Sequence, residues 1–328
     1  MLSNGFWRDI HVPQNMKGLI EKAKNLVVES RQPSTVKKYL LYFKMFARWC
    51  QGHSGLGFLP ASGVTVGLYL TDLVGSSTSL SRFYGCVYGI KWAHRWCGFE
   101  DPTQHHLPSL VIEAAKRRLS KKVQIKVPLT PKIIRLLLEK FWDISNVRKS
   151  RFVNMVLLAF HGFLRINELR NLKRSDLVFA GSHLKIILHK NKSDVYGAGA
   201  EVLIATTGGS YCPTKNLELF LLLTDNFSSG DMYLFRKLDG DKMSSLNLPM
   251  TYTEARAELK FYLSQVVSNE ADFSWHSFRH GGASAAASKG VPDRLLKRHG
   301  RWRSDSAKDG YIHDDLEARL SVSSKLCQ

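Results

Sequence analysis

The chain has 328 residues, of which 44% are hydrophobic and 11% aromatic, and this composition excludes a disordered protein. Its formal net charge is +19: residues 1–126 carry 18 Lys and Arg against 7 Asp and Glu, and residues 127–328 carry 29 against 21. Nucleic acid is therefore the first partner to consider, although a ribosomal or membrane-surface protein is equally basic. No apolar run suits a signal peptide or a membrane span, so we expect a soluble protein with no membrane partner.

Cysteine usage favours a reducing, intracellular setting. The five cysteines are odd in number and form no CxxC pair, which argues against a disulfide framework. His94 and Cys97 form a lone HxxC pattern without a second half, so a buried core pair is a better interpretation than zinc. We expect no metal site.

The first 126 residues predict a small, basic, all-helical domain. Apolar residues recur with helical periodicity from position 34, where Ser34 or Thr35 is available as the N-cap. The later segments interleave large aromatic residues with Lys and Arg, as a small helical core requires. The predicted helices span residues 34–51, 64–74, 80–97 and 109–122.

Basic side chains recur along these helices. On any one helix a solvated face is the plainer interpretation, but the repetition over several helices favours contact with DNA phosphates. The candidate DNA-binding residues are Lys37, Lys44, Arg48, Arg82, Lys91, Arg95, Arg117, Arg118, Lys121 and Lys122.

A linker over about 123–129 leads into a second domain, residues 127–328. Pro128 biases the preceding residue away from helix, and Thr130 can cap a helix that has Pro131 at its first position. A buried apolar helix over 152–163 follows and delivers Arg165 at its end.

The sequence predicts one sheet in this domain. The apolar runs HLKIILH and EVLIA flank KNKSDVYGAGA, whose Gly197 and Gly199 suit the turn between antiparallel strands. Helices are expected over 217–223 and 253–267, and the small-residue run GGASAAAS predicts a tightly packed helix.

The stretch from residue 275 to 312 carries the candidate chemistry. His276 and Arg279 are three residues apart, so they share a helix face and could hold and protonate a phosphate. Trp302 precedes Tyr311 by nine residues, and Tyr311 could attack a DNA phosphodiester. Taken singly, each of these residues is more often a core or ion-pair residue.

Five motifs occur together in a fixed order: HGFLRINELRNL, KNKSD, HSFRH, GRW and GYI. In order and separation they resemble the tyrosine recombinases, the integrase family of site-specific DNA strand exchangers. The resemblance holds motif by motif over about 130–315, and in architecture alone before it. KNKSD with RHGRWRSDSAKDGYI looks most like the enzymes of eukaryotic mobile elements of the DIRS, Ngaro and Crypton kind.

The resemblance implies a mainly α fold with a small antiparallel β-sheet. It implies an all-helical core-binding domain over 1–126 and an α+β catalytic domain over 127–328 with a C-terminal tail helix. Together the two would form a C-shaped clamp on double-stranded DNA.

The resemblance also assigns the site residues. Arg165 and Arg279 would neutralise the two non-bridging phosphate oxygens, and Glu168 takes an acidic position that orients the site. His276 is the candidate general base, and Tyr311 matches the nucleophile.

Three further positions depend on the resemblance. Lys192 matches the hairpin lysine that acts as general acid, and Lys190 competes with it for that role. Trp302 stands where most members have His, and packing alone would also explain it. The family's Gly-Leu-Arg is represented by residues 162–165, Gly-Phe-Leu-Arg, which is one residue longer.

The implied enzyme cleaves and rejoins DNA through a 3′-phosphotyrosine intermediate without metal or ATP, to integrate or excise a mobile element. It would act as a homo-oligomer, dimer to tetramer, joined through a tail with Ile312, Leu316 and Leu320 at helical spacing. The alternatives are a type IB topoisomerase and a domesticated, non-catalytic DNA-binding protein. A nuclear location is expected if the element is eukaryotic, and otherwise a cytoplasmic, DNA-associated one.

Overall fold

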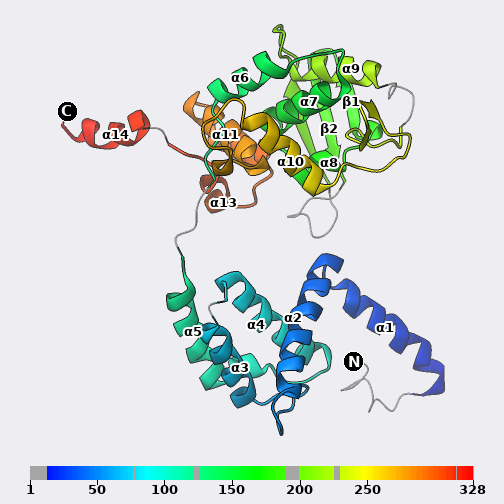
Figure 1. The fold of residues 1–328 in the computed structure, drawn as a ribbon, viewed down its shortest axis with the longest axis vertical. Coiled ribbons are helices and arrows are strands. Elements are labelled where there is room, and N and C mark those ends of the chain that lie inside the picture. The colour runs from blue at the N-terminus through cyan, green and yellow to red at the C-terminus, as the bar shows by residue number, and fades with distance from the viewer. Residues whose placement is uncertain are drawn as a thin grey trace. The chain divides into compact units, whose positions relative to one another are not determined.

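The computed structural model describes residues 13–76, 78–121, 126–189, 199–224, 230–314 and 316–327. The chain divides into two compact units, Met1–Val123 and Gln124–Gln328, close to the boundary expected after residue 126. Both units are mainly helical (Figure 1). Among the described residues, no helix is long and apolar enough to cross a membrane.

In its described residues, the first unit consists of helices without strands, as predicted. Its core is formed by large side chains such as Phe43, Phe46, Leu70 and Phe83, all fully buried. The four predicted helices are present, and one further helix precedes them. The helices are α1 (Lys17–Glu29), α2 (Pro33–Gln51), α3 (Gly63–Gly75), α4 (Leu80–Trp96) and α5 (His106–Leu119).

The structure tests two local predictions for this unit, the N-cap of α2 and the role of His94. Neither Ser34 nor Thr35 caps α2, because Pro33 occupies its first turn and Gln32 stands at the N-cap without a side-chain bond. His94 is a core residue: its Nε2 accepts from the Ala61 N–H at 2.9 Å, and its Nδ1 lies 2.8 Å from the Ile90 carbonyl. Both ring nitrogens are thus used within the core, so the buried interpretation of His94 is confirmed.

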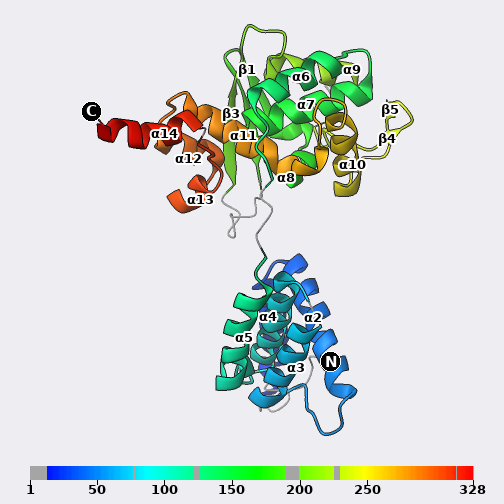
Figure 2. The ribbon, with the colours of Figure 1, turned by 60° about the vertical axis from the view of Figure 1, so that its left-hand side comes forward.

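The second unit places helices around a small sheet (Figure 2). As predicted, the Thr130 hydroxyl accepts from the Ile133 N–H at the start of the first of these helices. The helices are α6 (Pro131–Phe141), α7 (Val147–His161), α8 (Ile166–Arg170), α9 (Pro213–Leu223), α10 (Tyr252–Leu263), α11 (Trp275–Ser288), α12 (Asp293–Gly300), α13 (Asp305–Asp309) and α14 (Leu316–Ser324). α7 begins earlier than the predicted residue 152, because the Asn146 side chain caps it by accepting from the Lys149 N–H.

The sheet has the order β1–β2–β3 and is antiparallel throughout. Its strands are β1 (Leu177–Ala180), β2 (His183–Leu188) and β3 (Ala200–Ala205); a separate two-residue pair joins β4 (Leu238–Asp239) to β5 (Lys242–Met243). The β2–β3 hairpin was predicted and β1 was not. On β2, Leu184, Ile186 and Leu188 alternate into the core, as a half-buried strand requires.

Helix α11 lies unusually close to its neighbours. A Cβ atom at Gly281 would stand 1.9 Å from the Leu129 carbonyl oxygen, and one at Gly282 would stand 2.2 Å from that of Phe160. The Leu129 N–H donates to the Ser277 carbonyl at 3.0 Å, and the Val127 N–H donates to that of Asp272 at 2.9 Å. The tight packing expected of GGASAAAS is confirmed, and only glycine permits it.

Candidate active site

A pocket of about 670 Å³ in the second unit collects residues that are far apart in the sequence. Arg165 and Glu168 reach it from the start of α8, His276 from the first turn of α11, and Tyr311 from the segment after α13. His189, directly after β2, forms another part of the wall. The pocket thus brings together four of the predicted site residues.

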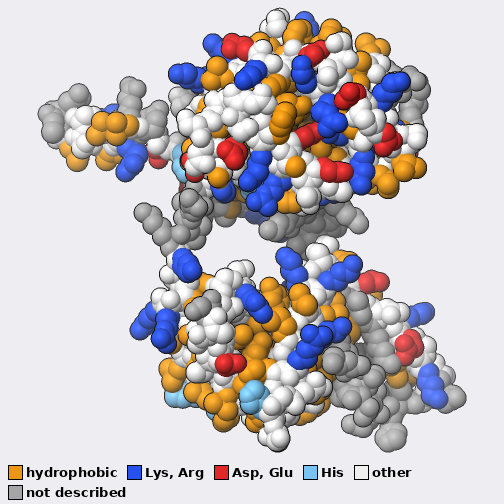
Figure 3. Space-filling view, in the orientation of Figure 1, with side chains coloured by type: hydrophobic (Ala, Val, Ile, Leu, Met, Phe, Trp, Pro, Cys, Tyr) orange, Lys and Arg blue, Asp and Glu red, His pale blue; other side chains and the backbone are white. Residues whose placement is uncertain are grey.

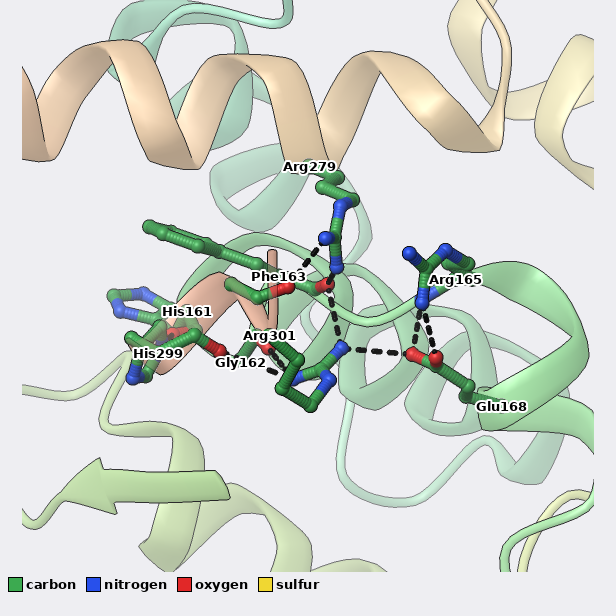
Figure 4. Close-up of polar contacts among 9 residues, drawn as sticks. His161, Gly162, Phe163, Arg165, Glu168, Arg279, His299 and Arg301 are labelled. Carbon is green, nitrogen blue, oxygen red and sulfur yellow. Dashed lines mark hydrogen bonds and ion pairs between the residues drawn. The ribbon is translucent and has the colours of Figure 1, made fainter. Parts of the chain in front are cut away.

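Arg165 and Glu168 form a rigid unit at the N-terminus of α8. The Arg165 backbone N–H donates to one oxygen of the Glu168 carboxylate at 2.9 Å, and its guanidinium donates to the other oxygen at 2.7 Å (Figure 4). Burial alone would raise the pKa of Glu168, but the charge of Arg301 and the bonds from Arg165 hold that pKa below its ordinary value. The carboxylate is therefore charged and fixes the direction of Arg165.

The turn before Arg165 contains the extra residue of Gly-Phe-Leu-Arg. Phe163 has φ 47°, in the left-handed region that favours glycine. Phe163 therefore takes a backbone conformation usual for glycine, directly before Leu164 and Arg165, and Gly162 stands one position earlier. The Phe163 carbonyl turns inward and accepts from both Arg279 and Arg301.

Arg279 is fully buried behind the pocket. Its guanidinium donates to the carbonyls of Phe163 and Gly300, and its central carbon lies 4.6 Å from the Trp302 ring centroid and 4.8 Å from that of Tyr311. Burial, and then the charges of Arg165 and Arg301, lower the pKa of Arg279. The site concentrates positive charge.

Tyr311 packs between two aromatic rings. Its ring centroid lies 4.5 Å from that of His280 in a stacked arrangement and 5.3 Å from that of Trp302. The ammonium of buried Lys308 pairs with Asp293, which ties α13 to the start of α12 just before Tyr311. The nucleophile candidate is therefore held by packing, and Trp302 does contribute packing as the sequence suggested.

Buried N–H groups of three residues around the site have no hydrogen-bond partner within the described part of the chain. They are Nε of Arg279, Nε of Arg301 and Nε1 of Trp302. A buried N–H without an acceptor is costly. Of the three residues, Arg279 is the one predicted to contact a phosphate.

His280 was not among the predicted site residues, although it stands in the HSFRH motif. Burial, followed by the charges of His313 and His276, lowers the pKa of His280 to about 4. His280 is thus neutral at pH 7 in the folded chain, where it stacks on Tyr311. A charged ring in this place would add to the repulsion around Arg279.

We expect His280→Phe to flatten the loss of stability on acidification. Between pH 6.5 and 4 the unfolded chain protonates this imidazole and the folded chain does not, so stability falls with falling pH, by about 1–2 kcal/mol at pH 5 from this residue. Phenylalanine keeps the stack and removes the proton. Urea unfolding of both proteins at pH 7 and at pH 5 gives the loss of unfolding free energy on acidification. An equal loss in the wild type and in His280→Phe would contradict the burial of a neutral His280.

Arg301 is a further residue that sequence reasoning missed. It stands in the run RHGRWR, where the recurring basic residues suggest an exposed segment, and nothing local marks it as buried. In the fold its side chain is buried, and it donates to Glu168 at 2.8 Å.

The remaining predicted residues are distributed as follows. Lys190, Lys192 and Lys122 lie outside the described residues. Lys91 is half-buried and pairs with Asp101 at 3.0 Å. The exposed ones are Lys37, Lys44, Arg48, Arg82, Arg95, Arg117, Arg118 and Lys121.

Basic side chains on the first unit therefore remain candidates for DNA contact, and Figure 3 shows several on the face turned to the viewer. Arg95 lies 3.9 Å from Asp101, the carboxylate that also pairs with Lys91. Lys91 and Arg95 share one negative charge, so their net pull on a phosphate is weaker than that of two lone cations.

Comparison with known proteins gives matches over both units. Residues 129–317 match the model of the phage integrase family. Over 303 residues the chain is 25% identical to the integrase/recombinase xerD homolog of Selenomonas ruminantium, covering 91% of this chain and 87% of the relative.

Two solved structures share the fold. The XerH site-specific recombinase bound to a palindromic difH substrate aligns with a TM-score of 0.61 at 13% identity, covering 89% of this chain and 80% of that one. A lambda integrase (75–356) dimer bound to a COC′ core site aligns with a TM-score of 0.57 at 15% identity, covering 90% and 95%. These likenesses confirm the predicted fold class.

Proposed function

Because the chain belongs to the phage integrase family, we propose that it is a site-specific DNA recombinase that cleaves and rejoins DNA with Tyr311 as the nucleophile. The observation that carries the proposal is the pocket itself. One cavity is lined by Arg165, His276 and Tyr311, and the buried Arg279 contacts the Tyr311 ring from behind. These are the side chains that attack on a phosphodiester requires, supplied by three separate elements.

The chemistry follows from these groups. The Tyr311 oxygen attacks the phosphorus, the bond to the 5′ oxygen breaks, and a 3′-phosphotyrosine forms. Negative charge gathers on the two non-bridging oxygens, where Arg165 and Arg279 stabilise it. His276, exposed at the pocket wall, takes the phenol proton. The reverse reaction rejoins the strand.

The leaving 5′ oxygen needs a proton, which we assign to Lys192, with Lys190 as the alternative. Both stand in KNKSD, directly after His189, which lines the pocket. Lys192 is three residues beyond His189, a reach of at most roughly 10 Å for extended chain plus the side chain's own length. A lysine from this segment can therefore reach a phosphate bound beside His189.

Covalent capture tests the proposal. The protein is incubated with a nicked suicide DNA substrate, from which the cleaved strand diffuses away so that religation cannot occur. We expect a protein–DNA adduct on the peptide that contains Tyr311, found by denaturing gel and mass spectrometry. Absence of an adduct on cognate DNA, or an adduct on another residue, would refute the assignment.

We further propose that the chain recombines as a homo-oligomer joined by its tail, the segment from residue 316 to the C-terminus. Ile312 packs in a cluster with Phe163, whereas Leu316 is 71% exposed and Leu320 is 54% exposed. The second unit also carries a largely apolar pocket of about 790 Å³ among α6, α7, α11 and α12. The tail of a neighbouring copy would cover apolar surface there.

Deleting the residues after Asp315 should weaken assembly of paired DNA sites more than cleavage of a single site, since the pocket of Tyr311 stays intact. Native gels report pairing, and adduct yield reports cleavage. Leu320→Asp should reproduce part of the defect, whereas Ser324→Asp on the same helix serves as the control. Equal loss of pairing and cleavage would argue against the tail as the link.

We also propose that the chain belongs with the recombinases of DIRS-, Ngaro- and Crypton-like mobile elements. On this proposal its two units close around DNA as a clamp, and it acts in the nucleus. KNKSD and RHGRWRSDSAKDGYI support it. Footprinting on the termini of such an element would test it, and protection no stronger than on unrelated DNA would refute it.

A further inference from the structure

Arg301 has the backbone of a glycine and the side chain of a buried cation. Its φ of 57° and ψ of 39° place it in the left-handed region, at the C-cap of α12. Glycine is the usual residue at such a helix end, because a side chain in the left-handed region is sterically strained. The hydrogen bonds and the ion pair of its guanidinium must therefore stabilise a buried arginine in this conformation.

The guanidinium of Arg301 joins three segments of the site (Figure 4). One terminal nitrogen donates to the carbonyls of Gly162 and His299, each at 3.2 Å. The other donates to the Phe163 carbonyl at 3.1 Å and to Glu168 at 2.8 Å. Arg301 therefore spans the turn before α8, the acidic residue of α8, and the end of α12.

Two of these four acceptors, the Phe163 carbonyl and the Glu168 carboxylate, are shared with an arginine assigned to the phosphate. Arg279 donates to the same Phe163 carbonyl, and Arg165 donates to the same Glu168 carboxylate. Arg279 also holds the Gly300 carbonyl, one residue before Arg301. The direction of both phosphate-binding arginines is thus fixed by groups that Arg301 also holds.

The charge arrangement has a second effect. Glu168 accepts from two guanidiniums, so its single negative charge is divided between Arg165 and Arg301. Within the described chain, the side-chain hydrogen bonds of Arg165 use one terminal nitrogen only. Among the residues that the structure describes, its other donors pair with no carboxylate, which suits a guanidinium that must bind a phosphate oxygen.

We infer that Arg301 is a positioning residue for strand cleavage, which joins the segment that carries Trp302 and Tyr311 to the arginines that hold the phosphate. The inference rests on the proposed function and adds a residue to it. Arg301 acts through Phe163, Glu168 and the backbone at Gly300. Its loss lets the nucleophile and the phosphate site shift against each other.

Two variants test this role. Arg301→Lys keeps the charge but cannot reach four acceptors at once, and Arg301→Gly removes the side chain while suiting the left-handed backbone. At saturating DNA we expect the cleavage rate of both to fall about 100-fold, since small misplacements of reacting groups have effects of this size. DNA affinity should stay within about threefold, because the Arg301 side chain is buried.

Chemical rescue separates positioning from folding. Ethylguanidinium should restore part of the cleavage rate of Arg301→Gly and none of Arg301→Lys, whose side chain still occupies the space. Arg303→Gly, at the exposed arginine two residues along, is the matched control and should keep the wild-type rate at saturating DNA. Wild-type rates in both Arg301 variants, or a folded Arg301→Gly protein without rescue, would overturn the inference.

Hydrogen exchange keeps the inference testable apart from catalysis. Amides of residues 302–312 should exchange faster in Arg301→Gly than in Arg303→Gly. If the wild-type protein forms no DNA adduct, the proposed function fails, and exchange alone then decides whether Arg301 anchors this segment. Unchanged exchange would contradict the anchoring.

Discussion

Tyr311→Phe is expected to abolish covalent DNA adducts while leaving DNA affinity nearly unchanged. The substitution removes the oxygen that would attack the phosphorus, so cleavage should fall by at least about 10⁴-fold. The ring itself packs between Trp302 and His280, and phenylalanine keeps that packing. Adduct yield on the suicide substrate and gel-shift affinity measure the two effects.

A matched control comes from the same unit. Tyr252 lies at the start of α10 and is half exposed, outside the pocket. Tyr252→Phe should form adducts at the wild-type rate. A Tyr311→Phe protein that still forms an adduct would show that another residue attacks.

Arg279→Lys is expected to lower the cleavage rate about 10³-fold. A lysine ammonium cannot hold the Phe163 and Gly300 carbonyls together while facing a phosphate, because it lacks the planar fork of the guanidinium. The Phe163 carbonyl keeps Arg301 as a donor, but the buried Gly300 carbonyl loses its guanidinium partner, which should also lower the free energy of unfolding by about 1–3 kcal/mol.

The comparison that isolates this effect is Arg256→Lys, at an exposed arginine on α10. It should leave both the cleavage rate at saturating DNA and the unfolding midpoint unchanged. Rates are compared at saturating DNA so that weaker binding does not mimic weaker catalysis. An Arg279→Lys enzyme within tenfold of wild type would exclude Arg279 from stabilising the transition state.

The helices were predictable where periodicity and local chemistry agree. The apolar positions of α2 repeat at helical spacing, and Thr130 with Pro131 marks the start of α6. The cap of α2 was wrong because Pro33 fits the first helical turn better than Ser34 fits the cap. β1 was missed because LVFA is four residues long and forms a strand only by pairing with β2.

The site was predictable for residues that stand in recognisable motifs, and unpredictable where burial depends on tertiary contacts. Arg165, Glu168, His276 and Tyr311 line one pocket, as their motifs implied. Arg301 appears exposed in the sequence, since its neighbours Arg298 and Arg303 are exposed. Its partners Gly162 and Glu168 are distant in sequence, and only the fold brings them into reach.

The packing of α11 against the linker's end has a mechanical consequence. The Val127 N–H donates to the Asp272 carbonyl, just before α11 begins, and the Leu129 N–H donates to the Ser277 carbonyl in its first turn. Gly281 packs so closely against Leu129 that no side chain would fit between them. A pull on the chain at residue 127 is therefore applied directly to the helix that carries His276 and Arg279. The segment from Val127 to Leu129 is thus anchored to α11, so the chain that enters the second unit is held directly against the helix that carries His276 and Arg279.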